Sequence, residues 1–414
     1  MSTETTFDVV IAGGSYAGLA LALALSVEAA GELKVAVVSP GFPRLDAGSE
    51  KDSRGSALSR GSLNLLQRIG AWPALSEHAQ PVSEIVLTDS DLGDAVRPEV
   101  MRYPLDPGSG SGFPAMAIVE NGRLGAALHA AARAAAGVTL LAGQSIASFA
   151  AQGDVVQAKL SDGRLMSARL LVAADGARSN LRALAQIGTV GWPYDQTGIV
   201  TTVVPEAPHG GTAVQHFLPA GPFALLPMTG NRVCVTWTED AAEARRILAL
   251  DGTGFRAQVE RRFGTDLGTL LTISAPQSWP LEVGIARSLT APRFALAGDA
   301  AHSLHPIAGQ GLNLGFRDVA ALAEALIDTG RLGLDIGAPE TLAHYERARR
   351  FDNLASAAGF DVLNRLFSTR STLARSARGA ALALADRLPN FKRLIIAEAA
   401  GETGDIPRML RPVG

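Results

Sequence analysis

The sequence is poor in cysteine, in aromatic residues and in charge. Its 414 residues contain one cysteine, Cys234, so neither an intrachain disulfide nor a cysteine-based zinc or iron–sulfur site can form. Aromatic residues make up 5% and charged residues 19% of the chain, against 47% hydrophobic residues, which excludes a wholly disordered chain. We expect helices and sheets that pack mainly on Ala, Leu and Val, in the reducing environment of the cytoplasm.

Long apolar runs and an excess of basic residues are also absent. The most apolar stretch, Gly18 to Ser26, is shorter than the roughly 20 helical residues that a membrane span needs. The polar segment from Met1 to Phe7 lacks the basic start of a signal peptide. The net charge of −3 disfavours a general nucleic-acid binder, since such a protein needs a basic face. We therefore expect neither a membrane span nor a nucleic-acid partner.

The start of the chain has the order strand, Gly-rich turn, helix, strand. Residues 7–12 (FDVVIA) form a short, β-branched apolar run that is typical of a buried parallel strand, and residues 34–38 (KVAVV) form a second. The Ala- and Leu-rich segment between them, residues 19–30, is predicted to be a helix. A dinucleotide-binding sheet requires this order, although any strand-helix-strand unit has it too.

The turn after the first predicted strand departs from the dinucleotide-binding fingerprint. Gly13, Gly14 and Gly18 allow a tight turn and close helix–strand packing, but Ser15 stands where the fingerprint has its middle glycine. The second predicted strand leads into Ser39 instead of an acid that would bind a ribose. A helix that starts here still aims free N–H groups at a phosphate. These residues alone leave nucleotide binding and a purely structural turn equally open.

Three later segments carry more specific patterns. They are DSRGSALS at residues 52–59, DGARSNLR at residues 175–182 and GDAAHSLHPIAGQGLN at residues 298–313. With these segments the chain resembles the class A FAD-dependent aromatic monooxygenases. More narrowly, it resembles their ubiquinone-biosynthesis hydroxylase branch. The residues behind this narrower resemblance are GPFALLP at 221–227, HPIAGQGLNLGFRD at 305–318, YERARR at 345–350 and LNRLFS at 363–368.

The resemblance covers essentially the whole chain and implies an α/β fold. A Rossmann-like FAD-binding domain would carry an inserted, mainly antiparallel β-sheet substrate domain and a C-terminal helical region. The expected bounds are 1–80, 115–185 and 286–335 for a discontinuous FAD-binding domain, 81–114 and 186–285 for the substrate domain, and 336–414 for the C-terminal helices. Apolar patterns predict further helices at residues 58–69, 124–136, 243–263 and 312–329.

The resemblance also implies which residues contact the cofactor. The implied FAD-binding residues are Gly13, Gly14, Ser15, Gly18, Ser39, Arg54, Arg123, Asp175, Asp299, Gly309, Gly311, Leu312 and Asn313. Asp299 is expected on the ribityl hydroxyls, although an Asp after a strand also suits a helix N-cap. Arg54 and Arg123 are expected on the FAD, against the alternative of surface arginines. Asp175 is expected mainly to hold its neighbours in place.

The resemblance further places Pro306 beside the reactive edge of the flavin, with His305 as a candidate contact near the substrate. His302 and His305 have a spacing that could suggest a metal, but neither a cysteine nor a nearby acid cluster completes a site, so we expect none. The expected substrate-contacting residues are His216, Phe217, Leu226 and Pro227. Phe217 and Leu226 fit an ordinary hydrophobic core equally well.

The implied reaction is hydroxylation of an aromatic ring of a polyprenylated phenol or quinol precursor in ubiquinone biosynthesis. NAD(P)H would reduce the FAD as a transient cosubstrate, and O2 would react through a C4a-hydroperoxyflavin. The alternatives are a hydroxylase of a soluble phenol or aromatic polyketide, and a non-catalytic flavoprotein that scaffolds a biosynthetic complex. We expect a cytoplasmic protein. The Arg-rich segment 371–392 leaves open a peripheral contact with a membrane or with partner proteins.

Overall fold

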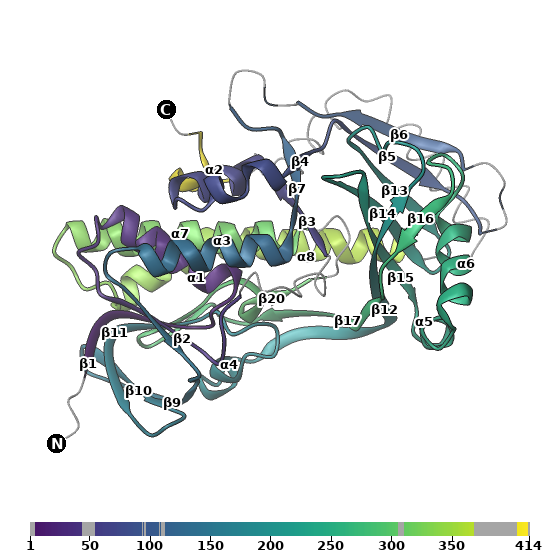
Figure 1. Ribbon diagram of the computed structural model, residues 1–414. Coiled ribbons are helices and arrows are strands. Elements are labelled where there is room, and N and C mark those ends of the chain that lie inside the picture. Colours follow the sequence, from purple (N-terminus) through teal and green to yellow (C-terminus); the bar gives the residue numbers. More distant parts are fainter. Residues whose placement is uncertain are drawn as a thin grey trace.

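Three β-sheets organise the protein. The computed structural model describes residues 5–43, 54–92, 94, 97–106, 108, 112–304, 310–367 and 404–412. In these residues the chain forms an eight-stranded, a nine-stranded and a three-stranded sheet. Figure 1 shows the eight-stranded sheet and the nine-stranded sheet at opposite ends of the molecule, with helix α8 (Pro339–Phe367) reaching from one toward the other.

The eight-stranded sheet has a parallel centre. Its parallel strands, in spatial order, are β19 (Phe294–Leu296), β11 (Leu165–Ala173), β1 (Thr5–Ala12), β2 (Val35–Ser39) and β8 (Val138–Ala142). The antiparallel additions are β9 (Ile146–Gln152), β10 (Val155–Leu160) and β18 (Thr290–Ala291). Ala12 is in register with Ala173 on one side and with Val38 on the other. The carboxyl ends of the parallel strands therefore meet at one edge of the sheet.

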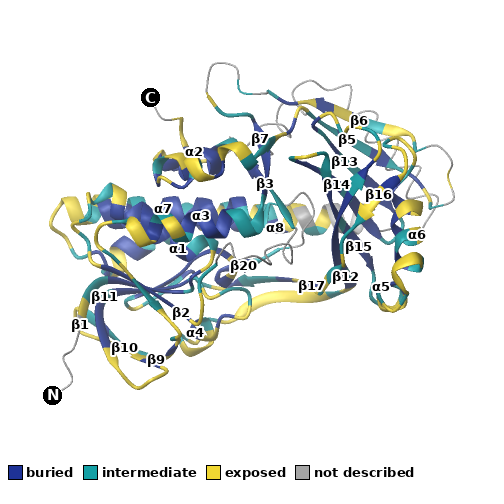
Figure 2. Ribbon diagram, in the orientation of Figure 1, coloured by how far each residue is buried: buried dark blue, intermediate teal, exposed yellow. Residues whose placement is uncertain are grey.

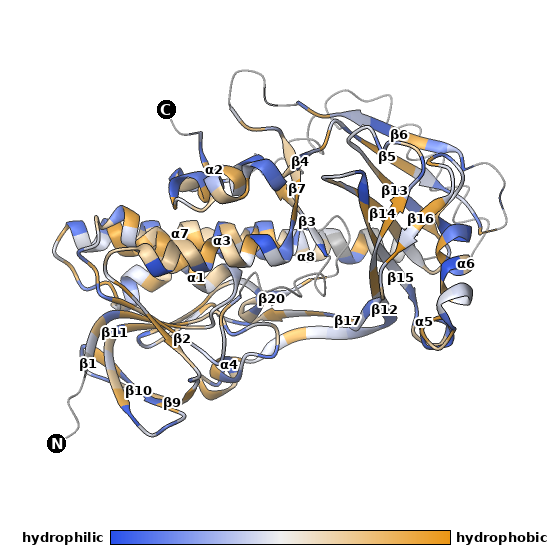
Figure 3. Ribbon diagram, viewed as in Figure 1, coloured by the Kyte–Doolittle hydropathy of each residue, from blue (hydrophilic) through white to orange (hydrophobic). Residues whose placement is uncertain are grey.

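Helices pack on this sheet, whose central strands are mainly apolar. The covering helices are α1 (Tyr16–Glu28), α3 (Asn121–Ala134) and α7 (Gly311–Arg331), and α8 packs on α7. Helix α1 is buried from Gly18 to Ser26, and Figures 2 and 3 show it as buried and hydrophobic. A strand covered on both faces needs apolar side chains in both directions, as β2 has from Val35 to Val38.

The nine-stranded sheet is mainly antiparallel. Its strands are β5 (Glu84–Asp89), β6 (Glu99–Pro104), β12 (Thr189–Pro205), β13 (Thr212–Leu218), β14 (Gly221–Met228), β15 (Arg232–Asp240), β16 (Leu270–Ile273), β17 (Gln277–Ala286) and β20 (His302–Ser303). Helices α5 (Ala241–Leu248) and α6 (Gly252–Phe263) cover one face, over a core that includes Phe223 and Trp237. The other face packs on the three-stranded sheet through Ile118, Met228 and Cys234.

Short elements complete the fold. The three-stranded sheet consists of β3 (Gly55–Ser59), β4 (Gln80–Pro81) and β7 (Met116–Glu120). The remaining helices are α2 (Arg60–Arg68), α4 (Asn180–Leu184) and the 3-10 turns at Trp72–Ala74, Ser76–His78, Gly298–Ala300 and Arg408–Leu410. Within the described parts of the chain, no helix is both long enough and apolar enough to cross a membrane.

The predicted α/β fold class is confirmed, with local differences. The helix predicted at 58–69 begins only at Arg60, because Leu58 lies in β3 and the Ser59 hydroxyl caps α2 by accepting from the Ser62 amide. The helix predicted at 243–263 is two helices, since the Asp251 carboxylate accepts from the Gly254 amide at 2.7 Å and starts a new one. The proposed domain boundaries stay predictions.

Candidate cofactor site

A cavity of about 620 Å³ opens at the edge where the parallel strands end. This volume lies within the range of small-molecule and cofactor sites, and the strand-end position is the usual ligand position in such sheets. Segments from four distant parts of the sequence line the cavity. Of the predicted cofactor residues, Gly13, Gly14, Ser15, Ser39, Asp175, Asp299, Gly311 and Leu312 belong to its lining.

Two glycines, one before α1 and one in its first turn, are required by the backbone itself. Gly13 has φ +118°, and a Cβ there would lie 2.1 Å from the Ala174 carbonyl oxygen of the neighbouring strand end. A Cβ at Gly18 would lie 1.9 Å from the Gly13 carbonyl oxygen. Any side chain at either position would displace the turn. Gly18 thus shapes the site from outside the cavity lining.

Ser15 is compatible with this turn although it replaces the usual glycine. Its φ of −100° is available to any residue, and its side chain is exposed at the N-cap of α1 without making a capping hydrogen bond. The first turn of α1 contains no acidic residue, and its amide groups lack intrahelical partners. The end of α1 therefore offers N–H groups, positive helix-dipole charge and one hydroxyl to an anion.

A second helix begins at the same cavity. Gly311 and Leu312, the first residues of α7, line it, and the first turn of α7 also lacks acidic residues. The Asn313 side chain is engaged elsewhere, because its Oδ1 accepts from the Ser59 amide at 3.0 Å and from the Ser62 hydroxyl at 2.7 Å. Asn313 thus ties α7 to the start of α2, which leaves cofactor contact to the N–H groups of this turn.

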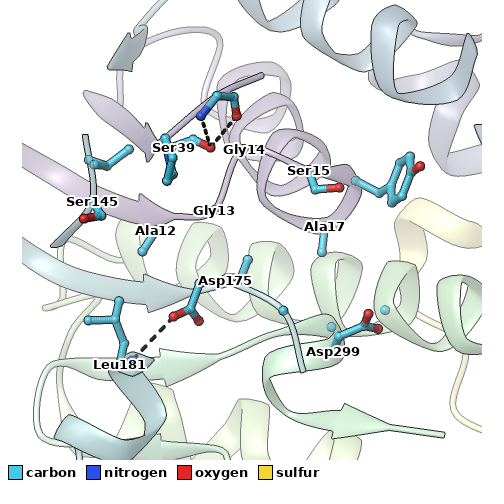
Figure 4. A pocket seen from close by; sticks show the side chains of 18 of the residues that line it. Ala12, Gly13, Gly14, Ser15, Ala17, Ser39, Ser145, Asp175, Leu181 and Asp299 are labelled. Carbon is cyan, nitrogen blue, oxygen red and sulfur yellow. Dashed lines mark hydrogen bonds between the residues drawn. The ribbon is translucent and has the colours of Figure 1, made fainter. Parts of the chain in front are cut away.

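Asp299 brings a carboxylate to the cavity. It lies inside the 3-10 turn Gly298–Ala300, and the N-cap of this turn is Ala297. Asp299 therefore does not have the N-cap role that was the alternative to cofactor binding. Figure 4 shows Asp299 and Asp175 across the cavity from the turn that carries Gly13 and Ser15. Asp299 is open to the cavity, but the surrounding protein desolvates it and raises the pKa of its carboxyl above the ordinary value. The nearby Asp318 carboxylate adds to this rise, whereas His302 opposes it.

Asp175 and Ser39 line the cavity but are engaged by their own neighbours. Asp175 Oδ2 accepts from the amides of Asn180 at 3.1 Å and Leu181 at 3.4 Å, which supports the start of α4 as expected. The Ser39 hydroxyl donates to the Gly41 carbonyl at 2.5 Å, so its proton is already used within the loop. Figure 4 draws the bond between Asp175 and Leu181 and the bonds of the Ser39 hydroxyl.

The two predicted arginines lie outside the lining of this cavity. The Arg54 guanidinium stands over the Trp279 ring, 5.8 Å from its centre. The Arg123 guanidinium lies 3.3 Å from the Glu120 carboxylate, which also pairs with Arg232 at 2.5 Å. Arg232 lowers the pKa of Glu120 despite its partial burial. Contacts of Arg54 and Arg123 with FAD stay predictions.

The predicted substrate residues fall on two faces of the nine-stranded sheet. Leu226 packs in the cluster that faces the three-stranded sheet, and Phe217 shares that face with Ala213, four residues earlier on β13. His216 points to the opposite face, where its Nδ1 is 2.6 Å from the Thr88 hydroxyl. Burial lowers the pKa of His216 to about 3. Alternation places Pro227 opposite Leu226 as well, so the four residues do not form one surface.

The predicted site residues and the lining of the cavity overlap only in part. His305, Pro306 and Gly309 lie outside the described residues, and their roles stay predictions. Tyr16, Ser145 and Ile146 line the cavity although the sequence patterns did not single them out. Recognising residues 138–142 as a parallel strand beside β2 would have placed residues 145–146 near this edge.

The donor set of the cavity suits a dinucleotide that carries a flavin. The N-terminus of α1, which has no acidic residue in its first turn, and the Ser15 hydroxyl fit the phosphates. The N-terminus of α7, which also lacks acidic residues, fits an electron-rich ring edge, and Asp299 can accept hydrogen bonds from ribityl hydroxyls. A parallel sheet with a site at its carboxyl edge is the arrangement of dinucleotide-binding α/β folds. The family model described as "FAD binding domain" matches residues 6–352.

Known proteins are similar over nearly the whole chain. Ubiquinone hydroxylase UbiL of Rhodospirillum rubrum is 40% identical, over 100% of this chain and 94% of the relative. The 3-demethoxyubiquinol 3-hydroxylase of Escherichia coli is 31% identical, over 96% of this chain and 100% of the relative. The p-nitrophenol 4-monooxygenase PnpA of Pseudomonas putida has the same fold, with a TM-score of 0.79 at 21% identity, over 97% of this chain and 100% of PnpA.

The chain belongs to the FAD-binding family of class A flavoprotein monooxygenases, in the branch of the ubiquinone-biosynthesis hydroxylases. The predicted enzyme class, FAD-dependent monooxygenase, is thereby confirmed.

Proposed function

We propose that this chain hydroxylates an aromatic ring of a polyprenylated phenol or quinol precursor in ubiquinone biosynthesis, with NAD(P)H and O2 as cosubstrates. The observation that carries this proposal is the strand-end cavity suited to FAD, in a chain that aligns over its whole length with a ubiquinone hydroxylase. The ring position, the preferred nicotinamide nucleotide and the tail length are open to experiment.

The protein's own residues bind and orient, because bound FAD supplies the hydride and oxygen chemistry. The α1 amides and the Ser15 hydroxyl would hold the pyrophosphate, and Asp299 would accept from the ribityl hydroxyls. The amides at the start of α7 would stabilise negative charge on the ring system. Arg54 and Arg123 are further proposed contacts of the cofactor, and His305 and Pro306 are proposed to lie at its reactive edge.

The substrate is proposed to meet the face of the nine-stranded sheet that turns toward the three-stranded sheet. Phe217 and Leu226 lie on that face, and Leu226 packs there in the cluster that contains the buried side chains of Ala57 and Ile118. An apolar wall of this kind accommodates an aromatic ring with an apolar tail and keeps water away from it.

The decisive experiment removes the gene from the host and measures quinone precursors by mass spectrometry. We expect a polyprenylated precursor that lacks one hydroxyl group to accumulate, and its structure names the ring position. The purified, FAD-loaded protein should then oxidise NADH or NADPH faster when that precursor is added, and hydroxylated product should match the nucleotide consumed.

Three results would replace this proposal. A normal quinone profile after deletion removes the pathway assignment. Coupled turnover with a short phenol but not with the tailed precursor supports a hydroxylase of soluble phenols or polyketides. A protein that binds FAD but never oxidises NAD(P)H with the precursor that accumulates, or with any other phenol, supports a flavoprotein scaffold.

A lipid-tailed substrate resides in a membrane, so we include peripheral membrane contact in this proposal. Helix α8 carries Phe351, Leu354 and Val362 on one face, exposed by 78%, 48% and 61%. Their spacing of three and eight residues puts them on one stripe of the helix. An exposed apolar stripe suits shallow insertion among lipid headgroups.

A further inference from the structure

A buried carboxylate connects the cavity edge to the C-terminal helix. Asp318 of α7 is 0% exposed. Its Oδ2 accepts from the Gly298 amide at 3.0 Å and from His302 Nε2 at 2.6 Å. Gly298 lines the cavity and directly precedes Asp299. The Asp318 carboxylate therefore holds the turn that presents Asp299.

Helix α8 completes this arrangement from the other side. Arg349 is 1% exposed, and its Nε donates to Asp318 Oδ1 at 2.9 Å. Its Nη atoms donate to Asp352 at 2.7 Å and to Asn353 at 2.9 Å. Arg349 thus has a partner on each side of its guanidinium, as a buried cation requires.

The charge state of this network follows from its donors. Every group on Asp318 donates a hydrogen bond, and His302 and Arg349 hold the pKa of Asp318 at about 2 despite its complete burial. A carboxylate only accepts, so the His302 proton that faces it must reside on Nε2. Among the described residues, His302 Nδ1 is buried without a hydrogen-bond partner.

We propose that the Asp318–Arg349 pair is a positioning device through which α8 sets the conformation and the electrostatic field of the turn that binds FAD. This inference rests on the proposed function, because it takes the cavity as the FAD site. Neither Asp318 nor Arg349 lines the cavity, so both would act on bound FAD through the Gly298–His302 turn. Removing either partner therefore changes FAD affinity through geometry, and it changes the flavin reduction potential through the altered net charge of the network.

The test measures the FAD dissociation constant and the midpoint potential of bound FAD, at saturating FAD, in four variants. Asp318→Asn removes one negative charge from the network, so the potential should rise, since a more positive surrounding favours the added electrons. Arg349→Met removes one positive charge, so the potential should fall. In both variants the FAD dissociation constant should increase roughly 10- to 100-fold, as expected for a lost charged hydrogen bond.

A double variant without either charge, and a control variant without a change of charge, test the same inference if a single variant fails to fold. Asp318→Asn combined with Arg349→Met removes both charges, so the potential should return close to the wild-type value while FAD still binds more weakly. Tyr345→Phe removes another buried bond from α8, which the Tyr345 hydroxyl donates to the Leu296 carbonyl at 2.7 Å. This uncharged change should leave the potential unaltered.

The outcomes separate this inference from the proposed function. Wild-type protein that does not bind FAD contradicts the proposed function itself. Wild-type protein that binds FAD, with single variants whose potentials shift in the same direction or stay unchanged, contradicts only the positioning role. A double variant that binds FAD as tightly as the wild type contradicts it too.

Discussion

At the scale of single residues, Ser15 shows how a cofactor role can be separated from a structural one. A serine at a helix start usually caps the helix, but the Ser15 side chain makes no capping bond and lies open to the cavity. Its hydroxyl is therefore available to a ligand. The same reasoning applies to Asp299, which is open to the cavity and is not the N-cap of its turn.

We predict that Ser15→Ala weakens FAD binding without destabilising the fold. Loss of one neutral hydrogen bond corresponds to about a 2- to 12-fold increase in the FAD dissociation constant, measurable by flavin fluorescence. Asp251→Ala is the matched contrast, because Asp251 caps α6 far from the cavity with a bond of 2.7 Å to the Gly254 amide. It should cost about 0.5–2 kcal/mol in urea unfolding and leave FAD affinity unchanged. Equal effects of both changes on FAD would contradict this assignment.

We predict that Asp299→Asn weakens FAD binding more strongly, roughly 10- to 100-fold, because an ionised acceptor is lost. The wild-type affinity should fall as the pH drops, and it should do so at a higher pH than for an ordinary aspartate, since desolvation by the surrounding protein raises the pKa of Asp299. Binding titrations across acidic pH check both points. An Asp299→Asn protein with the same pH dependence as the wild type would show that another group titrates.

At the scale of elements, helix α8 contributes to two different parts of the molecule. Its buried side supplies Arg349 to the network under the cavity, and its exposed side carries the apolar stripe of Phe351, Leu354 and Val362. Figure 1 shows α8 running along the molecule between the two large sheets. One helix therefore connects an exposed apolar surface to the Gly298–His302 turn at the cavity.

We predict that Phe351→Ser combined with Leu354→Ser reduces binding to lipid vesicles. The two side chains are 78% and 48% exposed, so the change removes apolar area from a membrane contact and little from the core. Co-sedimentation with vesicles that contain anionic lipid measures the effect. Leu271→Ser is the control, since Leu271 on β16 is 59% exposed at a different surface. Equal vesicle binding by all three proteins would remove the membrane contact from the proposal.

At the scale of the whole molecule, one buried histidine is expected to shape acid stability. His216 lies between the nine-stranded sheet and α6, and burial lowers its pKa to about 3. In the unfolded chain its pKa is the ordinary value of about 6.5. Above that pH both states are neutral, and below it only the unfolded state takes up the proton. Folding stability should therefore fall as the pH decreases from about 6.5 toward 3.

We predict that His216→Gln removes this component of the acid sensitivity. The wild type should lose about 1.4 kcal/mol per pH unit more than the variant between pH 6 and pH 4, when unfolding by urea is compared at each pH. His344→Gln is the control, because His344 is exposed on α8. A His216→Gln protein whose stability falls as steeply as that of the wild type would contradict the buried neutral state of His216.

Local patterns alone were enough for the strands and helices near the start of the chain, but not for the role of the turn between them. Continuous apolar runs predict strands that are covered on both faces, and the Gly-rich turn between them is compatible with a phosphate site, which the three later segments then favoured. Gly13 and Ser15 were singled out in this way because they stand in the turn before α1, although the carbonyl that excludes a side chain at Gly13 belongs to the distant Ala174. The α/β class and the monooxygenase family also followed from short segments.

Long-range contacts decided the rest, because sequence spacing carries no information about which distant segments meet. Asp318, Arg349 and His302 come from three elements and form one buried network only when α7 and α8 pack together. The alternation along β13 separates His216 from Phe217, but only the covering helices determine which face is which. By itself the sequence determined the elements and the cofactor class, whereas burial and packing decided which side chains face the cavity.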